Sequence, residues 1–232
     1  MTLLLLPFGA RADLLSSGFD AEFGLYYSGI YIGSNQRQVR RQGNTLEIHS
    51  QAQPRGLAKA FFSDVVSETS TMQFHHKELQ PLRYTYKQTG GKDIVDARVD
   101  FDQKNKQVHI SQDKQTFALT GNSFDVLGFQ FALMQQLQQG KDHFRFDVAT
   151  HNGVESYSAK IKNKHAEIQT GYGEANTVLV ESSNKKGDRH FLLWCDPKLD
   201  YLPVRVEHKR EGKGSTLLEL ESLTPHTRLS QQ

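Results

Sequence analysis

Ten histidines are the most obvious source of metal or proton-transfer chemistry in this chain. His75 and His76 are adjacent, and adjacent residues on a strand face opposite sides. His143 and His151 flank a predicted hairpin, and no acidic residue joins them in an H-x-x-x-H or H-E-x-x-H pattern. Because metal sites need two or three convergent ligands, we expect scattered surface histidines and no metal.

The sequence also lacks the motifs that surround a catalytic nucleophile or a bound phosphate. The sequence has no G-x-S-x-G motif of the kind that α/β-hydrolases place on a strand-to-helix turn. Cys195 lies between Trp194 and Asp196 without the surroundings of a catalytic cysteine, so we expect a small buried residue at a strand end. The glycine-containing segments 90–91 and 171–173 lack the Lys-Ser/Thr pair of a phosphate loop. The sequence argues against an enzyme, and no cofactor is expected.

Charge and cysteine content restrict the partners. The chain has 28 Lys and Arg against 26 Asp and Glu, a formal charge of +2, so its overall field does not favour nucleic acid. Tyr84 and Tyr86, with Arg83 and Lys87 beside them, resemble a base-stacking strand. Near-neutral charge favours an ordinary half-buried strand there, and no nucleic-acid partner is expected. A single cysteine excludes an internal disulfide.

The amino terminus has the composition of an export signal. An apolar run from Leu3 to Phe8 is followed by Ala10-Arg11-Ala12, an A-x-A type of cleavage site, although no basic residue precedes the run. The run is far shorter than the roughly 20 residues that span a bilayer. We therefore predict a signal peptide over residues 1–12, cleavage after Ala12 and a periplasmic domain over residues 13–232 with no membrane-spanning segment.

Period-two alternation of apolar and polar residues dominates the rest of the chain. It predicts roughly ten strands, each with one apolar face. Three hairpins are indicated, with strands over 97–110, 144–161 and 202–223. The first turns at 103–106, the second at Asn152-Gly153 in a type I′ turn, and the third at 211–214.

One segment, residues 123–139, has helical spacing instead. Its apolar positions are Phe124, Leu127, Phe131, Met134 and Leu137. A cap at residue 122 or 123, an acidic residue at 125 for the first turn, and a glycine at 140 would begin and end this helix. Segment 57–66 is ambiguous between a short helix and a strand. The fold class predicted is mainly β, a strongly curved antiparallel sheet or half-open barrel with the helix on its concave side.

The stretch Y-Y-S-G-I-Y-I-G, residues 26–33, is interpreted as part of the first long strand. Gly29 and Gly33 would then share one face and permit a sharp bend or the close approach of another backbone.

Several short motifs resemble a known bacterial family. They are F-G-L-Y-Y-S-G-I-Y-I-G near the start, D-V-L at 125–127, the glycine at 140, and W-C-D-P-K-L-D-Y-L-P-V-R-V-E at 194–207. In order and spacing they resemble the family labelled domain of unknown function 3108. The resemblance implies an exported protein of no agreed activity, with a shape similar to the half-closed barrels of periplasmic lipoprotein-localisation carriers.

Together these features predict a non-enzymatic periplasmic binding protein or carrier that holds a hydrophobic small molecule or lipid, an acyl chain or a lipoprotein in an apolar concavity. An envelope interaction protein that docks a protein partner is the alternative. A hydrolase with polar residues around His143, Asp147 and His151 ranks third. Candidate lining residues, each also explicable as plain core, are Phe61, Phe62, Phe124, Phe131, Met134 and Trp194.

Overall fold

The computed structural model describes residues 14–227, and its fifteen strands form one continuous sheet. The strands are β1 (Phe19–Tyr27), β2 (Ile30–Gln42), β3 (Thr45–Pro54), β4 (Val65–His75), β5 (Glu78–Thr89), β6 (Val95–Asp102), β7 (Gln107–Ile110), β8 (Gln115–Ala118), β9 (Ser123–Asp125), β10 (His143–Thr150), β11 (Gly153–Thr170), β12 (Gly173–Asn184), β13 (Arg189–Asp196), β14 (Leu202–Arg210) and β15 (Thr216–Pro225). Their order in the sheet is β8-β7-β6-β5-β4-β3-β2-β1-β15-β14-β13-β12-β11-β10-β9. Every pair is antiparallel except β9–β10, which is parallel.

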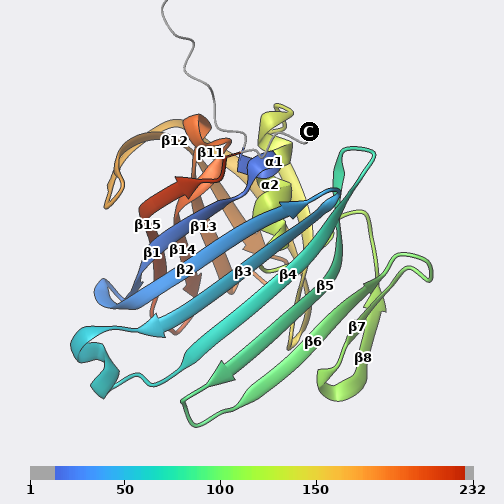
Figure 1. The fold of residues 1–232 in the computed structure, drawn as a ribbon, viewed down its shortest axis with the longest axis horizontal. Helices are drawn as coiled ribbons and strands as arrows, with labels where there is room; N and C mark the ends of the chain where they lie inside the picture. The colour runs from blue at the N-terminus through green and yellow to red at the C-terminus, as the bar shows by residue number, and fades with distance from the viewer. Residues whose placement is uncertain (1–13, 228–232) are drawn as a thin grey trace, which may run out of the picture.

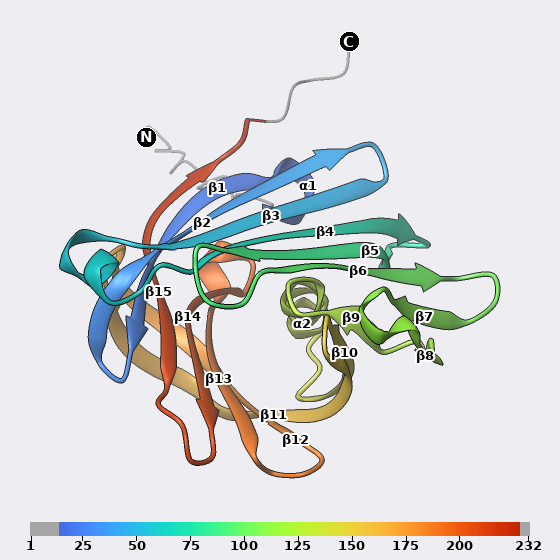
Figure 2. The same ribbon diagram turned by 90° about the horizontal axis from the view of Figure 1, so that it is seen from below.

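The sheet curls so that its two halves face each other (Figure 2). β1 joins the halves because it pairs with both β2 and β15. The longest helix, α2 (Gly128–Gln138), lies between the halves and contacts β5, β9, β10 and β14 (Figure 1). The predicted fold class, a curved and mainly β sheet with one principal helix on its concave side, is confirmed, although the sheet has more strands than the alternation indicated.

The predicted helix over 123–139 begins too early. Residues 123–125 instead form β9, which adds to the edge of the sheet beside β10. The turn into α2 is capped by Asp125, whose Oδ1 accepts hydrogen bonds from the backbone N–H groups of Leu127 (3.0 Å) and Gly128 (2.8 Å). At the other end Gly140 has φ +76° and its N–H donates to the carbonyl of Leu137, so the predicted glycine exit is confirmed.

The core lies between α2 and the surrounding strands. Phe131 and Met134 of the helix are fully enclosed, and the ring of Phe131 stacks on that of Phe19 from β1 at 6.3 Å. Phe129 of the helix has its ring 5.8 Å from that of Phe146 on β10. Each such side chain contributes about 1.5–3 kcal/mol of burial free energy, so the helix is held by apolar contacts with both halves of the sheet.

Two turns differ from the prediction. Ser28 (φ +47°) and Gly29 (φ +82°) form a two-residue turn between β1 and β2, so the interpretation of residues 26–33 as one bent strand is wrong. Gly33 does lie against a neighbouring backbone, because a Cβ there would meet the carbonyl oxygen of Gln53 at 2.1 Å. In the β10–β11 hairpin Thr150 pairs with Gly153, so the turn residues are 151 and 152. Neither has positive φ, so the predicted type I′ turn is wrong, whereas the turns at 103–106 and 211–214 are confirmed.

The remaining helices are short: α1 (Leu14–Ser17), η1 (Gly56–Ala60), η2 (Gln112–Lys114) and η3 (Pro197–Leu199). The ambiguous segment 57–66 contains most of η1 and the start of β4. None of the helices within residues 14–227 has the length and apolar character that a membrane crossing requires. The predicted signal peptide, residues 1–12, lies outside the described residues.

Candidate functional site

The strand order places seven connections at one end of the curved sheet, which we call the mouth. These are the β1–β2, β3–β4, β5–β6, β7–β8, β10–β11, β12–β13 and β14–β15 connections, as the antiparallel pairing requires (Figure 1). On the β10–β14 side of the mouth a pocket of about 840 Å³ opens between the strands, β8 and the turn into α2.

The pocket wall is mainly apolar. Alternate residues of a strand face the same side, and the lining residues of β8, β10 and β13 alternate in this way, whereas β11 contributes the consecutive residues 153–157. Phe191 of β13 lies at the centre of the wall, with its ring 6.0 Å from Phe129, 5.6 Å from Tyr157 and 4.4 Å from His208. The other apolar lining residues are Phe117, Val126, Val148 and Val154.

The outer part of the pocket is basic. Lys185 and Lys186 come from the exposed β12–β13 turn, and Arg189 begins β13. Arg189 Nη1 lies 3.0 Å from Glu155 Oε2, and the Tyr157 hydroxyl donates to the same carboxylate oxygen at 3.1 Å. Burial, together with the charge of Glu155, raises the pKa of Tyr157 to about 12. Tyr157 therefore stays protonated at neutral pH and remains a donor.

Two nitrogen atoms of the lining residues are buried without a hydrogen-bond partner in the described part of the chain. They are Nε of Arg189 and Nε2 of His208. Burial first, and then the positive charges of Arg189 and Arg210, lower the pKa of His208, so its imidazole is neutral at pH 7. A buried donor without a partner costs about 1–3 kcal/mol. A ligand oxygen that reached Arg189 Nε would remove that cost, whereas Nε2 of the neutral His208 can be a donor or an acceptor.

The six residues predicted to line a ligand site do not lie together, and none of them lines this pocket. Phe124, Phe131 and Met134 are core residues around α2. Trp194 is half-buried on β13, with the guanidinium of Arg205 5.7 Å from the centre of its ring. Phe61 and Phe62 are exposed in the β3–β4 connection at the mouth.

The three residues predicted for a hydrolase do not converge. His143, Asp147 and His151 are four residues apart along one strand and its turn, a spacing of about 13 Å from one to the next. His143 pairs with Asp142 at 2.8 Å, and the ring of His151 stacks on a tyrosine of β5. Asp147 accepts hydrogen bonds from the hydroxyls of residues 120 and 156. Across residues 14–227, no three His, Cys, Asp or Glu side chains are grouped as metal ligands would be.

Cys195 occupies the position that its surroundings predicted. It is fully buried near the end of β13, and burial raises the pKa of its thiol. A thiol with a raised pKa is a poor nucleophile.

A buried polar group under α2 was not predicted from the sequence. Arg37 of β2 donates through Nη1 to Gln130 Oε1 at 3.1 Å, and Tyr84 donates to Glu68 Oε1 at 2.5 Å. Burial lowers the pKa of Arg37 to about 10 and raises that of Glu68. The first contact joins α2 to β2, and the second joins β5 to β4. The sequence offered one signal of this group: Arg37 occupies an inward position of a strand whose other inward residues alternate with polar ones.

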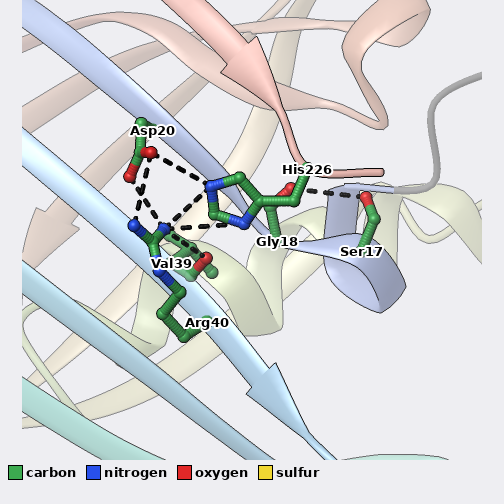
Figure 3. A network of polar contacts seen from close by, with 6 residues as sticks. All are labelled: Ser17, Gly18, Asp20, Val39, Arg40 and His226. Carbon is green, nitrogen blue, oxygen red and sulfur yellow. Dashed lines mark hydrogen bonds and ion pairs between the residues drawn. The ribbon is translucent and has the colours of Figure 1, made fainter. Parts of the chain in front are cut away.

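A second polar network joins the first and last described segments of the chain at β1 and β2 (Figure 3). Arg40 Nη1 donates to Asp20 Oδ1 at 2.7 Å, and His226 Nε2 lies 3.1 Å from Asp20 Oδ2. The hydrogen bond from Arg40 is the main cause of the lowered pKa of Asp20. The Ser17 hydroxyl donates to the carbonyl of Gly18, which also accepts from the backbone N–H of His226. The network therefore clamps the segment after β15 onto the first strands.

One family model and one solved structure bear on the family and the fold of this chain, and neither assigns a function. A family model described as "Protein of unknown function (DUF3108)" matches residues 22–221. The crystal structure of a β-barrel-like protein of domain of unknown function DUF1849 from Brucella abortus has a TM-score of 0.61 at 10% identity, covering 91% of this chain and 99% of that one. A "putative lipoprotein" from Parabacteroides distasonis has a TM-score of 0.33 at 12% identity, covering 90% and 96%. No curated protein matches the sequence.

Proposed function

Since the chain belongs to the DUF3108 family, which is described only as of unknown function, we propose a function from its own geometry: a non-enzymatic periplasmic binding protein or carrier for a hydrophobic ligand. The observation that carries the proposal is the pocket of about 840 Å³ beside Phe191. Sites for small molecules are concave, largely apolar and of about 300–1,000 Å³. The similarity to periplasmic lipoprotein-localisation carriers is an analogy of fold and remains a prediction.

The walls suit a flexible apolar chain. Aromatic and branched side chains line the pocket from four separate strands, and its polar side chains come mainly from the turns and strand ends at the mouth, with His208 beside Phe191. Each methylene group that leaves water for such a wall contributes about 0.8 kcal/mol. An acyl chain would therefore bind along the wall and leave its polar end at the mouth.

A blocked pocket tests this proposal. We expect purified protein to bind Nile red and to retain apolar molecules in native mass spectra that disappear after delipidation. Val154→Trp, which places a large ring in the pocket, should abolish both signals. Val95→Trp is the matched control, because Val95 is also half-buried but does not line the pocket. Absence of binding by the wild type, or unchanged binding by Val154→Trp, would overturn the proposal.

Docking of an envelope protein is the second candidate, favoured by a different observation. Seven large apolar side chains are exposed on three neighbouring connections of the mouth, a patch that we call the apolar rim: Tyr27, Ile30, Tyr31, Leu57, Phe61, Phe62 and Ile94. Exposed apolar patches of this kind mark interaction surfaces.

A photo-cross-linking amino acid at residue 61, where the native side chain is 85% exposed, tests docking in cells. Residue 172 is the control, because Tyr172 is also exposed but lies at the opposite end of the sheet. A single protein trapped at 61 and not at 172 supports docking. Equal trapping at both positions, or none, refutes it.

A further inference from the structure

We propose that the pocket selects an amphiphile with an anionic head group, a carboxylate or a phosphate, bound by Lys185, Lys186 and Arg189 while its chain lies along Phe191. This inference rests on the proposed function and goes further, because it assigns the chemical class of the ligand.

The charge of the lining residues supports an anion. Three cationic side chains line the pocket, and Glu155 is the one carboxylate among its lining residues. The pocket is thus locally positive, although the whole chain is close to neutral. Asp188 lies in the same turn as the two lysines, but its Oδ1 accepts a hydrogen bond from Asn184 Nδ2 at 2.6 Å and it does not line the pocket.

The turn that carries the lysines is held in place by hydrogen bonds. The backbone N–H of Lys185 donates to the carbonyl of Ser156 on β11 at 3.1 Å. Asn184 Oδ1 accepts from the backbone N–H of Arg189 at 3.2 Å, and the Asn184 carbonyl accepts from Gly187 at 3.0 Å. The lysine backbones are therefore fixed over the β10–β11 hairpin, so less ordering is needed when a ligand binds.

Arg189 has donor capacity that the protein does not use. One of its Nη atoms pairs with Glu155, whereas its buried Nε lacks a partner within the described residues. The neutral His208 holds a second unpartnered nitrogen in the same lining. An anionic oxygen would accept from Arg189 Nε, and charge-assisted hydrogen bonds of this type are about twice as strong as neutral ones. A cationic head group would instead face three like charges.

The test compares four probes that share one chain: dodecyl phosphate, dodecanoate, dodecanol and dodecyltrimethylammonium, each below its micelle concentration. Displacement of Nile red from the wild type measures their affinities. We expect both anions to bind at least about tenfold tighter than dodecanol, which corresponds to about 1.4 kcal/mol, and the cation to bind weakest. The phosphate and carboxylate arms distinguish the two head groups, and a preference for either over dodecanol supports the inference.

Variants locate the effect. Lys185→Gln/Lys186→Gln should remove most of the preference for anions while dodecanol binding is unchanged. Lys59→Gln/Lys213→Gln is the matched control, because both lysines are exposed at the mouth but do not line the pocket. Arg189→Lys keeps the charge and removes Nε–H, and should weaken anion binding by a smaller factor.

The outcomes are distinguishable. Equal affinity for dodecanol and the anions overturns the head-group inference and leaves the proposed carrier intact. An equal loss in the two double variants also overturns it, because the preference would then reflect overall charge. If no probe displaces Nile red, or Nile red itself does not bind, both the inference and the proposed function fail.

Discussion

Two aspartates with the same local hydrogen bonds provide a sharp test of how burial acts in this fold. Asp125 Oδ1 accepts from the backbone N–H groups two and three residues later, at 3.0 and 2.8 Å, where the chain turns into α2. Asp102 Oδ1 accepts from the corresponding N–H groups at 2.9 and 2.9 Å, in the exposed β6–β7 turn. Asp125 is fully buried, whereas the Asp102 contacts are exposed. The two pKa shifts are opposite: burial raises that of Asp125, and hydrogen bonding lowers that of Asp102.

The structure sets the size of the expected effect. Asp125→Ala would leave the N–H groups of Leu127 and Gly128, both in buried residues, without an acceptor, and would also remove the acceptor of the Ser70 hydroxyl (2.6 Å). An unsatisfied buried donor costs about 1–3 kcal/mol and a lost helix cap about 1 kcal/mol. Counting about 1 kcal/mol for each of the three donors, the lower end of that range, we expect Asp125→Ala to lower the free energy of unfolding by at least about 3 kcal/mol. Asp102→Ala should lower the free energy of unfolding much less, because water can accept the hydrogen bonds that the exposed carboxylate accepts in the wild type.

Asp125→Asn separates hydrogen bonding from charge. Its Oδ1 can still accept from both backbone groups, so we expect it to cost at most about 1 kcal/mol near pH 7. Because the folded pKa of Asp125 is raised, the stability this group contributes is present below its unfolded pKa of about 3.9. It is lost as pH rises through the folded value. The difference in free energy of unfolding between Asp125→Asn and the wild type should therefore shift in favour of the variant as pH rises.

Urea unfolding of the wild type and the three variants, followed by tryptophan fluorescence from pH 4 to 8, measures these differences. Nile red binding provides a second readout, because Val126 and Phe129 beside the cap are part of the pocket wall or contact it. If Asp125→Ala and Asp102→Ala cost the same within about 0.5 kcal/mol, the reasoning from buried unsatisfied donors is refuted.

Three further predictions concern stability and reactivity. Asp20→Asn should cost less than about 1 kcal/mol at pH 7, because its pair with Arg40 is exposed. Since the pKa of Asp20 is lowered, the stability it contributes is lost as pH falls through the folded value, and thermal unfolding below that pH should no longer distinguish the variant. Gly33→Ala should cost at least about 2 kcal/mol in urea unfolding, because its Cβ would meet a backbone oxygen at 2.1 Å. Gly43→Ala, with open space but φ +58°, should cost about 1 kcal/mol, and equal costs would contradict the steric argument. Cys195 should react with a thiol reagent only at the rate of unfolding, and fast modification of the native protein would show that it is accessible.

The alternating sequence was sufficient to predict three of the hairpins because inward and outward positions have different chemistry. Phe144, Phe146 and Val148 are buried on β10, as their spacing requires. The apolar period of a strand fixes which face is buried, so the pairing follows wherever the turn is unambiguous. The same reasoning predicted Cys195 as a buried residue near the end of a strand.

Turn chemistry and the start of α2 were less predictable because distant pairing decides them. Asn152-Gly153 has the preferred residues of a type I′ turn, but the pairing of β10 with β11 moves the turn one residue earlier. Ser28-Gly29 is a dipeptide that marks turns, but the tyrosines and isoleucines on both sides favoured one continuous strand. Tyr27 instead pairs with Thr216 on β15 and with Ile30 on β2, which ends the strand there. Phe124 has helical spacing with Leu127, but its backbone adds to the sheet beside Val148 of β10.

The pocket could not be predicted because its walls come from strands spread over nearly a hundred residues, and no local pattern distinguishes Phe191 from a core residue. Its physical origin is the length of α2. A helix of 11 residues extends about 16 Å, whereas β5, with 12 residues, extends about 40 Å. The helix therefore fills only part of the concave face. The pocket lies where the helix is absent, next to the turn that precedes its first residue. The apolar spacing predicted a helix inside the sheet, but the helix length and the point at which Asp125 caps it determine where the core ends and the pocket begins.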